Sequence, residues 1–521
     1  MGKSKTFEIL KQSGVLSALR YVADKKAHKG GIYTLLQKLL MLFTLYSLDK
    51  PRAYEIYRAL RGYNICVADF LFLSYFAKEY DNIKAWIESK EFKDTYIMPP
   101  PPLYPPLLNP KEVDYTKIPA HIAWELNLPL PPYYKFIYFG SHATGNRGLN
   151  NLILNCGGMD YVLADSKKMY INYYEQIMSN RDLPKFGYLS VREYVSGKDA
   201  QKFYALIPKS KALNLVRDPI STLKSGVNFR RTMLKEAKEE KLHFSLKPDK
   251  VCENLVGYIS IDLSNNKLDF GGGKFPCVDI CRETIHYRFT DFHDTDLRKA
   301  LINIADEDII CIDMSEIIGE RAFETTKSLA NAFDFPSPKD KEKCEFHISL
   351  YEGLLPLVFE VPTYSKNIKI YLMDKVFVID ERIYVKVSVD EVDIWQHKNA
   401  FKHYQDITQF LFNQDNFYER IIVCIEKKDF EILKQDTKTC EQIKEYLLAF
   451  IPRLEEQRKI EESKRFSEKD ILEYFKSHKD LCLKAKAVFE KHLAFLASVR
   501  PDIIESWKYY QEFLAMCEEM S

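Results

Sequence analysis

The feature that most constrains this fold is a repeated succession of a short apolar segment and a helical stretch between residues 131 and 344. The apolar segments are Phe136–Phe139, Lys211–Val216 and Asp308–Asp313, and helical patterns follow at Leu149–Leu154 and Ala322–Phe333. Short strands that are apolar throughout are typical of parallel sheets whose two faces are covered by helices. The sequence therefore predicts an α/β domain with a parallel sheet over residues 131–344.

The segments before this domain differ from it in composition. Leu, Ala, Tyr and Lys recur with helical spacing over residues 1–95, which predicts a helical N-terminal unit. A proline-rich run, Met98–Pro110, follows. Proline fixes φ and removes a backbone donor, so we interpret residues 96–130 as a stiff connector that lies over the next domain. A proline-rich ligand for a partner protein is the alternative.

Within and after the α/β domain, we expect three further regions. Residues 228–300 are polar and contain Gly271–Gly273, and we interpret them as an insertion or lid with a flexible glycine loop. Residues 345–400 predict β-hairpins, with strands at Ile368–Leu372, Val376–Ile379 and Ile383–Val387. Residues 401–521 predict a mostly helical region. The expected fold is thus an α/β core with a helical N-terminal unit and an α+β C-terminal extension.

The C-terminal region carries two local predictions. A helix is expected to begin at Ser467, because Asp470 stands three residues later and an apolar run follows. The highly charged run Glu455–Lys469 is interpreted as a solvated helix face or linker.

Charge and cysteine content restrict the partners and the compartment. The chain has 75 Lys and Arg against 74 Asp and Glu, so its net charge of +1 gives no overall attraction for a nucleic-acid polymer. The 11 cysteines are scattered, and Cys311 and Cys424 lie inside apolar runs, which indicates buried free thiols and a reducing, cytoplasmic location. The spacing of Cys277, Cys281, His286 and His293 matches no zinc site, and no metal is expected.

The apolar stretch Leu35–Leu48 is too short to cross a bilayer and predicts an internal helix of the N-terminal unit. Because basic residues flank it, peripheral contact of these helices with a membrane surface is an alternative prediction.

A strand-to-helix loop at residues 138–149 is the first candidate for chemistry. Gly140 and Gly145 permit backbone angles that other residues resist, so successive N–H groups can face an anion at the start of a helix. The loop residues expected to contact such an anion are Gly140, Ser141, Thr144, Gly145, Asn146 and Arg147. A tight turn without a ligand is the alternative. No lysine follows the second glycine, so the loop is not an ATP- or GTP-binding motif.

A second candidate follows the strand at 211–216. Arg217 stands directly after it, at the edge where open α/β sheets bind ligands. Asp218 is the expected N-cap of the next helix and Pro219 its first residue, which places Ser225 two turns into that helix. Arg217 and Ser225 are therefore expected to hold one phosphate together. A structural ion pair of Arg217 is the alternative.

These two segments resemble motifs of the sulfotransferases, a family with a P-loop-like core. The loop at 137–152 looks like the one that holds the 5′-phosphosulfate of 3′-phosphoadenosine 5′-phosphosulfate. Leu215–Pro219 with Ser225 is similar to the family's 3′-phosphate motif. The segments Ile309–Ile318 and Phe333–Pro336 are similar to a later strand and helix end of that family. The whole arrangement also resembles an epsilonproteobacterial family, found in Campylobacter and Helicobacter, from which no activity is carried over.

The resemblance implies a transferase that moves a sulfuryl group from that donor to a hydroxyl of a sugar or cell-surface glycan. It departs from the family at the loop, where Ala143 replaces a lysine that neutralises charge on the bridging oxygen. Arg147 or His142 is the expected substitute, and His142 or Asp165 the expected base. Two alternatives stay open, namely a transferase with another nucleotide-linked donor and a catalytically degenerate nucleotide-binding or interaction protein.

Overall fold

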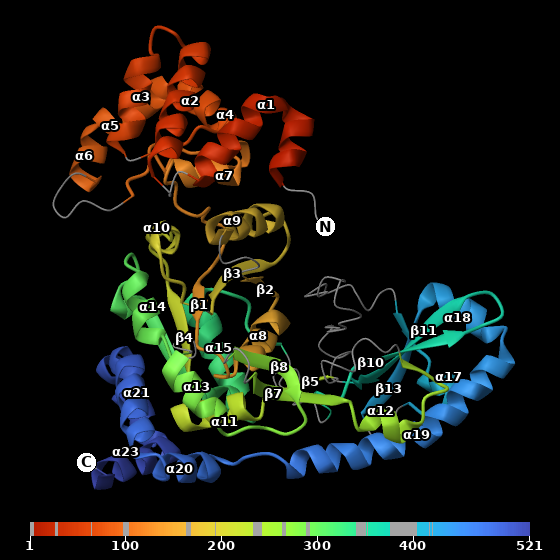
Figure 1. The fold of residues 1–521 in the computed structure, drawn as a ribbon. Coiled ribbons are helices and arrows are strands. Elements are labelled where there is room, and N and C mark those ends of the chain that lie inside the picture. The colour runs from red at the N-terminus through yellow and green to blue at the C-terminus, as the bar shows by residue number, and fades with distance from the viewer. Residues whose placement is uncertain are drawn as a thin grey trace.

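The computed structural model of the chain shows an α/β domain with a helical unit before it and a second sheet after it (Figure 1). The structure describes residues 5–26, 30–63, 65–96, 104–162, 168–192, 194–232, 242–262, 267–287, 292–339, 351, 353–375, 404–415, 417–418 and 420–520. The strands predicted at 376–379 and 383–387 lie outside these residues.

The α/β domain is built on a five-stranded parallel sheet, sheet A, with the order β2-β3-β1-β4-β9. Its strands are β1 (Ile137–Phe139), β2 (Gly158–Val162), β3 (Phe186–Val191), β4 (Ala212–Val216) and β9 (Ile309–Asp313). The three strands expected from apolar runs are β1, β4 and β9, so the prediction of a parallel α/β sheet is confirmed.

Helices cover both faces of sheet A because its side chains alternate between two apolar clusters. Leu213 and Leu215 pack with α8 (Asn146–Asn155) and α15 (Arg321–Phe333) on one face. Ile137 and Leu189 pack on the other face with α9 (Met169–Asn180), α10 (Lys198–Ala205) and α14 (Asp294–Ala300). Continuous burial of these strands explains why they are apolar throughout.

The N-terminal unit is helical, as the sequence predicts, and forms one end of the molecule (Figure 1). Its helices are α1 (Lys5–Lys26), α2 (Ile32–Leu48), α3 (Ala53–Gly62), α4 (Phe70–Lys78), α5 (Tyr80–Glu88) and α6 (Lys90–Tyr96). Among the described residues, no helix is long and apolar enough to cross a membrane.

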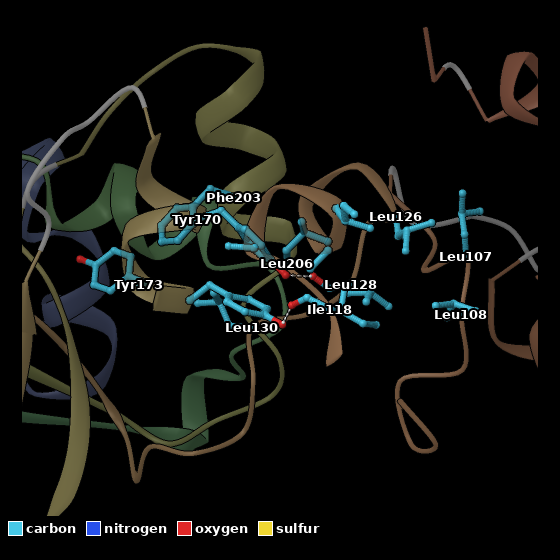
Figure 2. Packing of buried hydrophobic residues seen from close by; sticks show 14 of the residues in the cluster. Leu107, Leu108, Ile118, Leu126, Leu128, Leu130, Tyr170, Tyr173, Phe203 and Leu206 are labelled. Atoms are coloured by element: carbon cyan, nitrogen blue, oxygen red, sulfur yellow. Dashed lines mark hydrogen bonds between the residues drawn. The ribbon is translucent and has the colours of Figure 1, made fainter. Parts of the chain in front are cut away.

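The segment that follows the prolines packs along the α/β domain rather than standing free (Figure 2). It contains the short helices η2 (Tyr115–Lys117) and α7 (Ala120–Glu125). Its apolar side chains, Leu107, Leu126 and Leu128 among them, are fully buried in one cluster with α9 and α10. The hydroxyl of Tyr170 donates to the Leu128 carbonyl at 2.8 Å. This segment therefore fixes the N-terminal unit to sheet A.

Residues 228–300 are more regular than the sequence suggests. They contain a three-stranded antiparallel sheet of β5 (Arg230–Thr232), β7 (Val256–Asp262) and β8 (Lys267–Gly273), together with β6 (Leu242–His243), α12 (Pro248–Cys252), α13 (Ile280–Tyr287) and α14. The prediction of a flexible loop at Gly271–Gly273 is wrong, because these glycines end β8 and let its backbone approach β7 closely. A Cβ atom on Gly257 would lie 2.5 Å from the Gly271 carbonyl oxygen.

A second five-stranded sheet has the order β12-β13-β11-β10-β6. Its remaining strands are β10 (Leu357–Pro362), β11 (Asn367–Asp374), β12 (Tyr404–Asp406) and β13 (Ile421–Glu426), with helices α17 (Thr408–Phe412), α18 (Lys427–Lys434) and α19 (Thr437–Ser463). The strand predicted at 368–372 is β11. Two strands, β12 and β13, stand in the region that the sequence predicts as mostly helical.

The chain returns to sheet A through α19 and ends in α20 (Glu468–Lys476), α21 (Lys479–Val499), α22 (Pro501–Ser506) and α23 (Lys508–Met520) (Figure 1). The start of α20 at Ser467 is confirmed by a capping box with Asp470. The interpretation of 455–469 as solvated is wrong in part. Glu461 is only 2% exposed, and the Tyr258 hydroxyl donates to it at 2.6 Å. The buried strand thiols Cys311 and Cys424 are confirmed.

We expect Gly257→Ala to lower the free energy of unfolding by about 1–3 kcal/mol, because the methyl group would force β7 and β8 apart. Gly226→Ala is the matched control, since a Cβ there meets open space in a helix and the change should be neutral or stabilising by up to about 1 kcal/mol. Urea unfolding of both variants tests this prediction. Equal stability of the two would contradict it.

Candidate functional site

The candidate site lies at the carboxyl ends of β1 and β4, which are neighbours in sheet A. The helix after β1, α8, packs on the face of Leu215, whereas α11 (Pro219–Val227), the helix after β4, packs with Val216 on the opposite face. Where successive connections leave a parallel sheet on opposite faces, a crevice opens at the strand ends. The predicted loop and Arg217 border this position from its two sides.

Two glycines shape the loop between β1 and α8 for different reasons. Gly145 has a φ of 107° and stands as the N-cap of α8, a conformation that glycine adopts readily. Gly140 has no such angle, but a Cβ atom there would lie 3.0 Å from the Leu215 carbonyl oxygen of β4. Ala143 also adopts a positive φ, of 62°. The loop is thus tightly turned and lies against β4.

The side-chain donors expected to face an anion instead hold the loop together. The Thr144 hydroxyl donates to the Ser141 carbonyl at 2.7 Å, and the Asn146 amide donates to the same oxygen at 2.9 Å. The Asn146 carbonyl oxygen accepts from the buried Tyr138 hydroxyl. The structure differs here from the sequence-based expectation, because the buried Tyr138 hydroxyl and the carbonyl of the buried Ser141 lie within reach of these side chains. An anion would meet the backbone N–H groups of the first turn of α8, which have no partner within the helix.

Ser141 connects the loop to a distant part of the chain. Its fully buried hydroxyl donates to the Asp294 carboxylate at 2.7 Å, at the start of α14. The backbone N–H of Asp294 donates in turn to Nδ1 of His492 on α21 at 3.2 Å. Burial lowers the pKa of His492, with Asp294 and Asp296 opposing this effect and His293 adding to it. The loop, α14 and α21 therefore form one buried polar chain.

Arg217 joins the two predicted segments. Its Nη1 atom donates to the Ala143 carbonyl at 2.7 Å and to the Ser225 hydroxyl at 2.9 Å. Burial lowers the pKa of Arg217, and Glu468, Asp218 and Asp313 oppose this effect. Within the described residues, the Nε and Nη2 atoms of Arg217 donate to no protein acceptor. The guanidinium thus fixes the loop with one nitrogen and keeps two further donors at the strand ends.

The start of α11 agrees with its sequence signals. Asp218 caps the helix by accepting from the backbone N–H groups of Ile220 and Ser221, and Pro219 is the first residue, as expected. The second carboxylate oxygen of Asp218 accepts from the backbone N–H of Tyr510 on α23 at 3.1 Å. The cap therefore holds both α11 and a C-terminal helix at the end of β4.

The three residues expected to act in catalysis have different environments. His142 in the loop and Arg147 in the first turn of α8 are exposed. Asp165 lies outside the described residues. The structure brings Gly140, Ser141, Thr144, Gly145, Asn146, Arg217 and Ser225 together.

Sequence reasoning missed the carboxylate at the end of β9. Asp313 is 8% exposed and pairs in register with Val216 of β4. It accepts from the Trp507 indole N–H at 2.7 Å. An aspartate at the end of an apolar strand is the signal that would have found it. An open cavity of about 520 Å³ begins beside it and is lined by the segment after β9, α15 and α22, with Glu316, Arg321 and Arg500 in its wall.

The cavity and the loop share one segment of chain. A Cβ atom on Gly145 would lie 3.1 Å from Cγ of Met314, and the next residue, Ser315, lines the cavity. The loop and the cavity are therefore neighbours at the carboxyl edge of sheet A. Five carboxylates line this cavity, namely Asp313, Glu316, Glu320, Glu324 and Asp502.

In comparisons with known proteins, the family described as a protein of unknown function, DUF2972, matches residues 311–520. The match begins within β9 and runs through the second sheet to α23, so it includes Asp313 and Trp507 but neither the 140–147 loop nor Arg217. No curated protein and no solved structure matches the chain.

The buried His492 predicts a pH dependence of stability. Its ordinary pKa is 6.5, and burial lowers the pKa in the folded state. As the pH falls below 6.5, this histidine binds a proton in the unfolded chain but stays neutral in the folded chain. The free energy of unfolding therefore decreases by up to about 1.4 kcal/mol per pH unit. We expect urea unfolding at about pH 7.5 and about pH 5.5 to show a smaller loss for His492→Gln than for the wild type. His121→Gln, an exposed histidine of α7, is the control and should keep the wild-type loss.

Proposed function

We propose that the chain is a sulfotransferase-like group transferase that binds 3′-phosphoadenosine 5′-phosphosulfate at the carboxyl ends of β1 and β4. The observation that carries this proposal is the position of Arg217, within 2.7 Å of the Ala143 carbonyl and 2.9 Å of the Ser225 hydroxyl. The resemblance to sulfotransferases implies that the loop binds the 5′ end of the nucleotide and that Arg217 and Ser225 bind the 3′-phosphate. The same guanidinium thus links both halves of the proposed site.

The proposed nucleotide site combines a P-loop-like core with hydrogen-bond donors at the strand ends and at the start of α8. Nε and Nη2 of Arg217 form a planar pair suited to two oxygens of one phosphate, and the Ser225 hydroxyl adds a third contact. The backbone N–H groups at the start of α8 and the exposed Arg147 suit the phosphosulfate. No metal is part of this proposal.

The chemical step is an in-line transfer. The acceptor oxygen attacks sulfur, the bond between sulfur and the bridging oxygen breaks, and the electron pair of that bond stays on the phosphate of adenosine 3′,5′-bisphosphate. The acceptor proton passes to a base, for which His142 is the exposed candidate beside the loop. We assign the acceptor, a carbohydrate hydroxyl, to the cavity beside Met314, because its carboxylates and arginines suit hydrogen bonds to sugar hydroxyls.

A catalytically degenerate nucleotide-binding protein is the second candidate. It is favoured by Ala143 at the lysine position and by the engagement of Thr144 and Asn146 within the loop. Both candidates require nucleotide binding, and only the first requires transfer.

Binding is tested by calorimetry with adenosine 3′,5′-bisphosphate. We expect the wild type to bind, Ser225→Ala to bind about 10-fold more weakly through loss of one hydrogen bond to a charged group, and Arg217→Ala to lose binding. Arg217→Lys keeps the charge but not the planar fork, and should bind between these limits. Arg181→Ala, an arginine beyond α9, is the control and should bind as the wild type does. Absence of wild-type binding refutes both candidates. Equal binding by the folded Arg217 variants refutes the placement of the nucleotide at Arg217.

Transfer is tested with Ala143→Lys. Ala143 already carries a Cβ at positive φ, so lysine adds no new backbone strain there, and the Arg217 contact uses only the carbonyl of this residue. If the chain is a transferase, restoring this charge should raise sulfate transfer to a glycan acceptor by about 10²-fold. Ala143→Gln is the uncharged control. Nucleotide binding without sulfate transfer in the wild type and in Ala143→Lys favours the degenerate protein.

A further inference from the structure

Helix α2 exposes an unbroken apolar stripe. Five of its apolar side chains are more than half exposed: Ile32 at 76%, Leu35 at 57%, Leu39 at 56%, Phe43 at 60% and Tyr46 at 53%. They are spaced three or four residues apart, so they lie one above another on a single face of the helix. We call this face the α2 stripe.

The opposite face of α2 is the one that holds the helical unit together. Leu40, Met41, Thr44 and Leu45 are buried there, and the helix contacts α1, α3 and α4. Lys38 is the only charged residue of α2, and it lies outside the stripe. A helix that is apolar on both faces normally has both faces covered, and an exposed apolar patch of this kind marks an interaction site.

Cations lie near both ends of the α2 stripe. Residues 1–52 contain ten Lys and Arg against three Asp and Glu. Of these acids, Asp49 pairs with Arg52 at 2.7 Å, and burial raises the pKa of Asp24. The ammonium groups of Lys26 and Lys50 lie 5.3 Å from the ring centres of Tyr33 and Tyr46, near the two ends of α2. The stripe is therefore bordered by cations and aromatic rings.

We propose that the α2 stripe binds the surface of a membrane rich in anionic phospholipids. An exposed apolar helix face with basic residues around it lies in the plane of the interface, with the apolar side chains among the acyl chains and the lysines at the headgroups. A second copy of this chain would bring two surfaces of the same positive sign together, which costs free energy, whereas anionic headgroups are complementary. The N-terminal unit, which carries the α2 stripe, forms one end of the molecule (Figure 1).

This proposal is tested by sedimentation of the full chain with vesicles. The vesicles contain phosphatidylcholine alone or phosphatidylcholine mixed with phosphatidylglycerol. We expect binding to the mixed vesicles only, weakened by added salt. Lys26→Gln with Lys50→Gln should lower the partition coefficient by about 25-fold, at about fivefold for each lysine. Leu39→Gln with Phe43→Gln should lower it by about 10-fold or more.

The controls separate this proposal from general stickiness and from self-association. Leu448→Gln changes a leucine of α19 that is 50% exposed, and it should bind vesicles as the wild type does. Circular dichroism checks that each variant is folded. The proposal is overturned by absence of binding to the mixed vesicles, or by equal binding of the variant that carries both Leu39→Gln and Phe43→Gln. It is also overturned by a wild-type dimer in light scattering that this double variant converts to a monomer. Nucleotide calorimetry is independent of this result, so the proposed function and the lipid surface fail separately.

Discussion

The organisation of the carboxyl edge of sheet A depends on one guanidinium. Arg217 stands where β4 ends, reaches the loop after β1 through the Ala143 carbonyl, and contacts α11 through Ser225. An arginine in this position stays charged even though burial lowers its pKa, because the ordinary pKa of arginine lies far above neutrality. The loop therefore has a permanent positive charge behind it, which a lysine or histidine at the same place would not guarantee.

The C-terminal helices, which are remote in sequence, also contact this edge of sheet A. Trp507 donates to Asp313 at the end of β9, Tyr510 donates to Asp218 at the end of β4, and Lys224 of α11 donates to Glu468 at 2.6 Å. Each contact joins a strand end or its helix to α20 or to the segment 507–510. The DUF2972 match includes all of these C-terminal partners. The matched region thus supports the site even though the loop and Arg217 precede it.

Sequence patterns of adjacent residues correctly predicted the elements whose conformation depends on those residues. The strands β1, β4 and β9, the Asp218 cap and the capping box at Ser467 each follow from a few adjacent residues. Signals of this kind fail where the partner is remote. The hydrogen bond between Ser141 and Asp294 spans 153 positions, and the burial of Glu461 depends on Tyr258, 203 positions away. The prediction of a flexible loop at Gly271–Gly273 was wrong because these glycines allow close contact with the neighbouring strand, β7, which local sequence does not reveal.

The hydrogen bonds within the loop also bear on the proposed anion site. Thr144 and Asn146 use their donors on the Ser141 carbonyl, so they stabilise the turn instead of offering contacts that depend on the ligand. A turn fixed in this way holds the N–H groups of the first turn of α8 in place before any anion arrives, which lowers the entropy cost of binding. Under the proposed function, Thr144 and Asn146 would therefore position the turn for phosphate oxygens and would add no donor for the charge that develops during transfer. Under the proposed function, the fixed turn would serve binding, whereas transfer would need a further positive charge at the loop, which Ala143 does not supply.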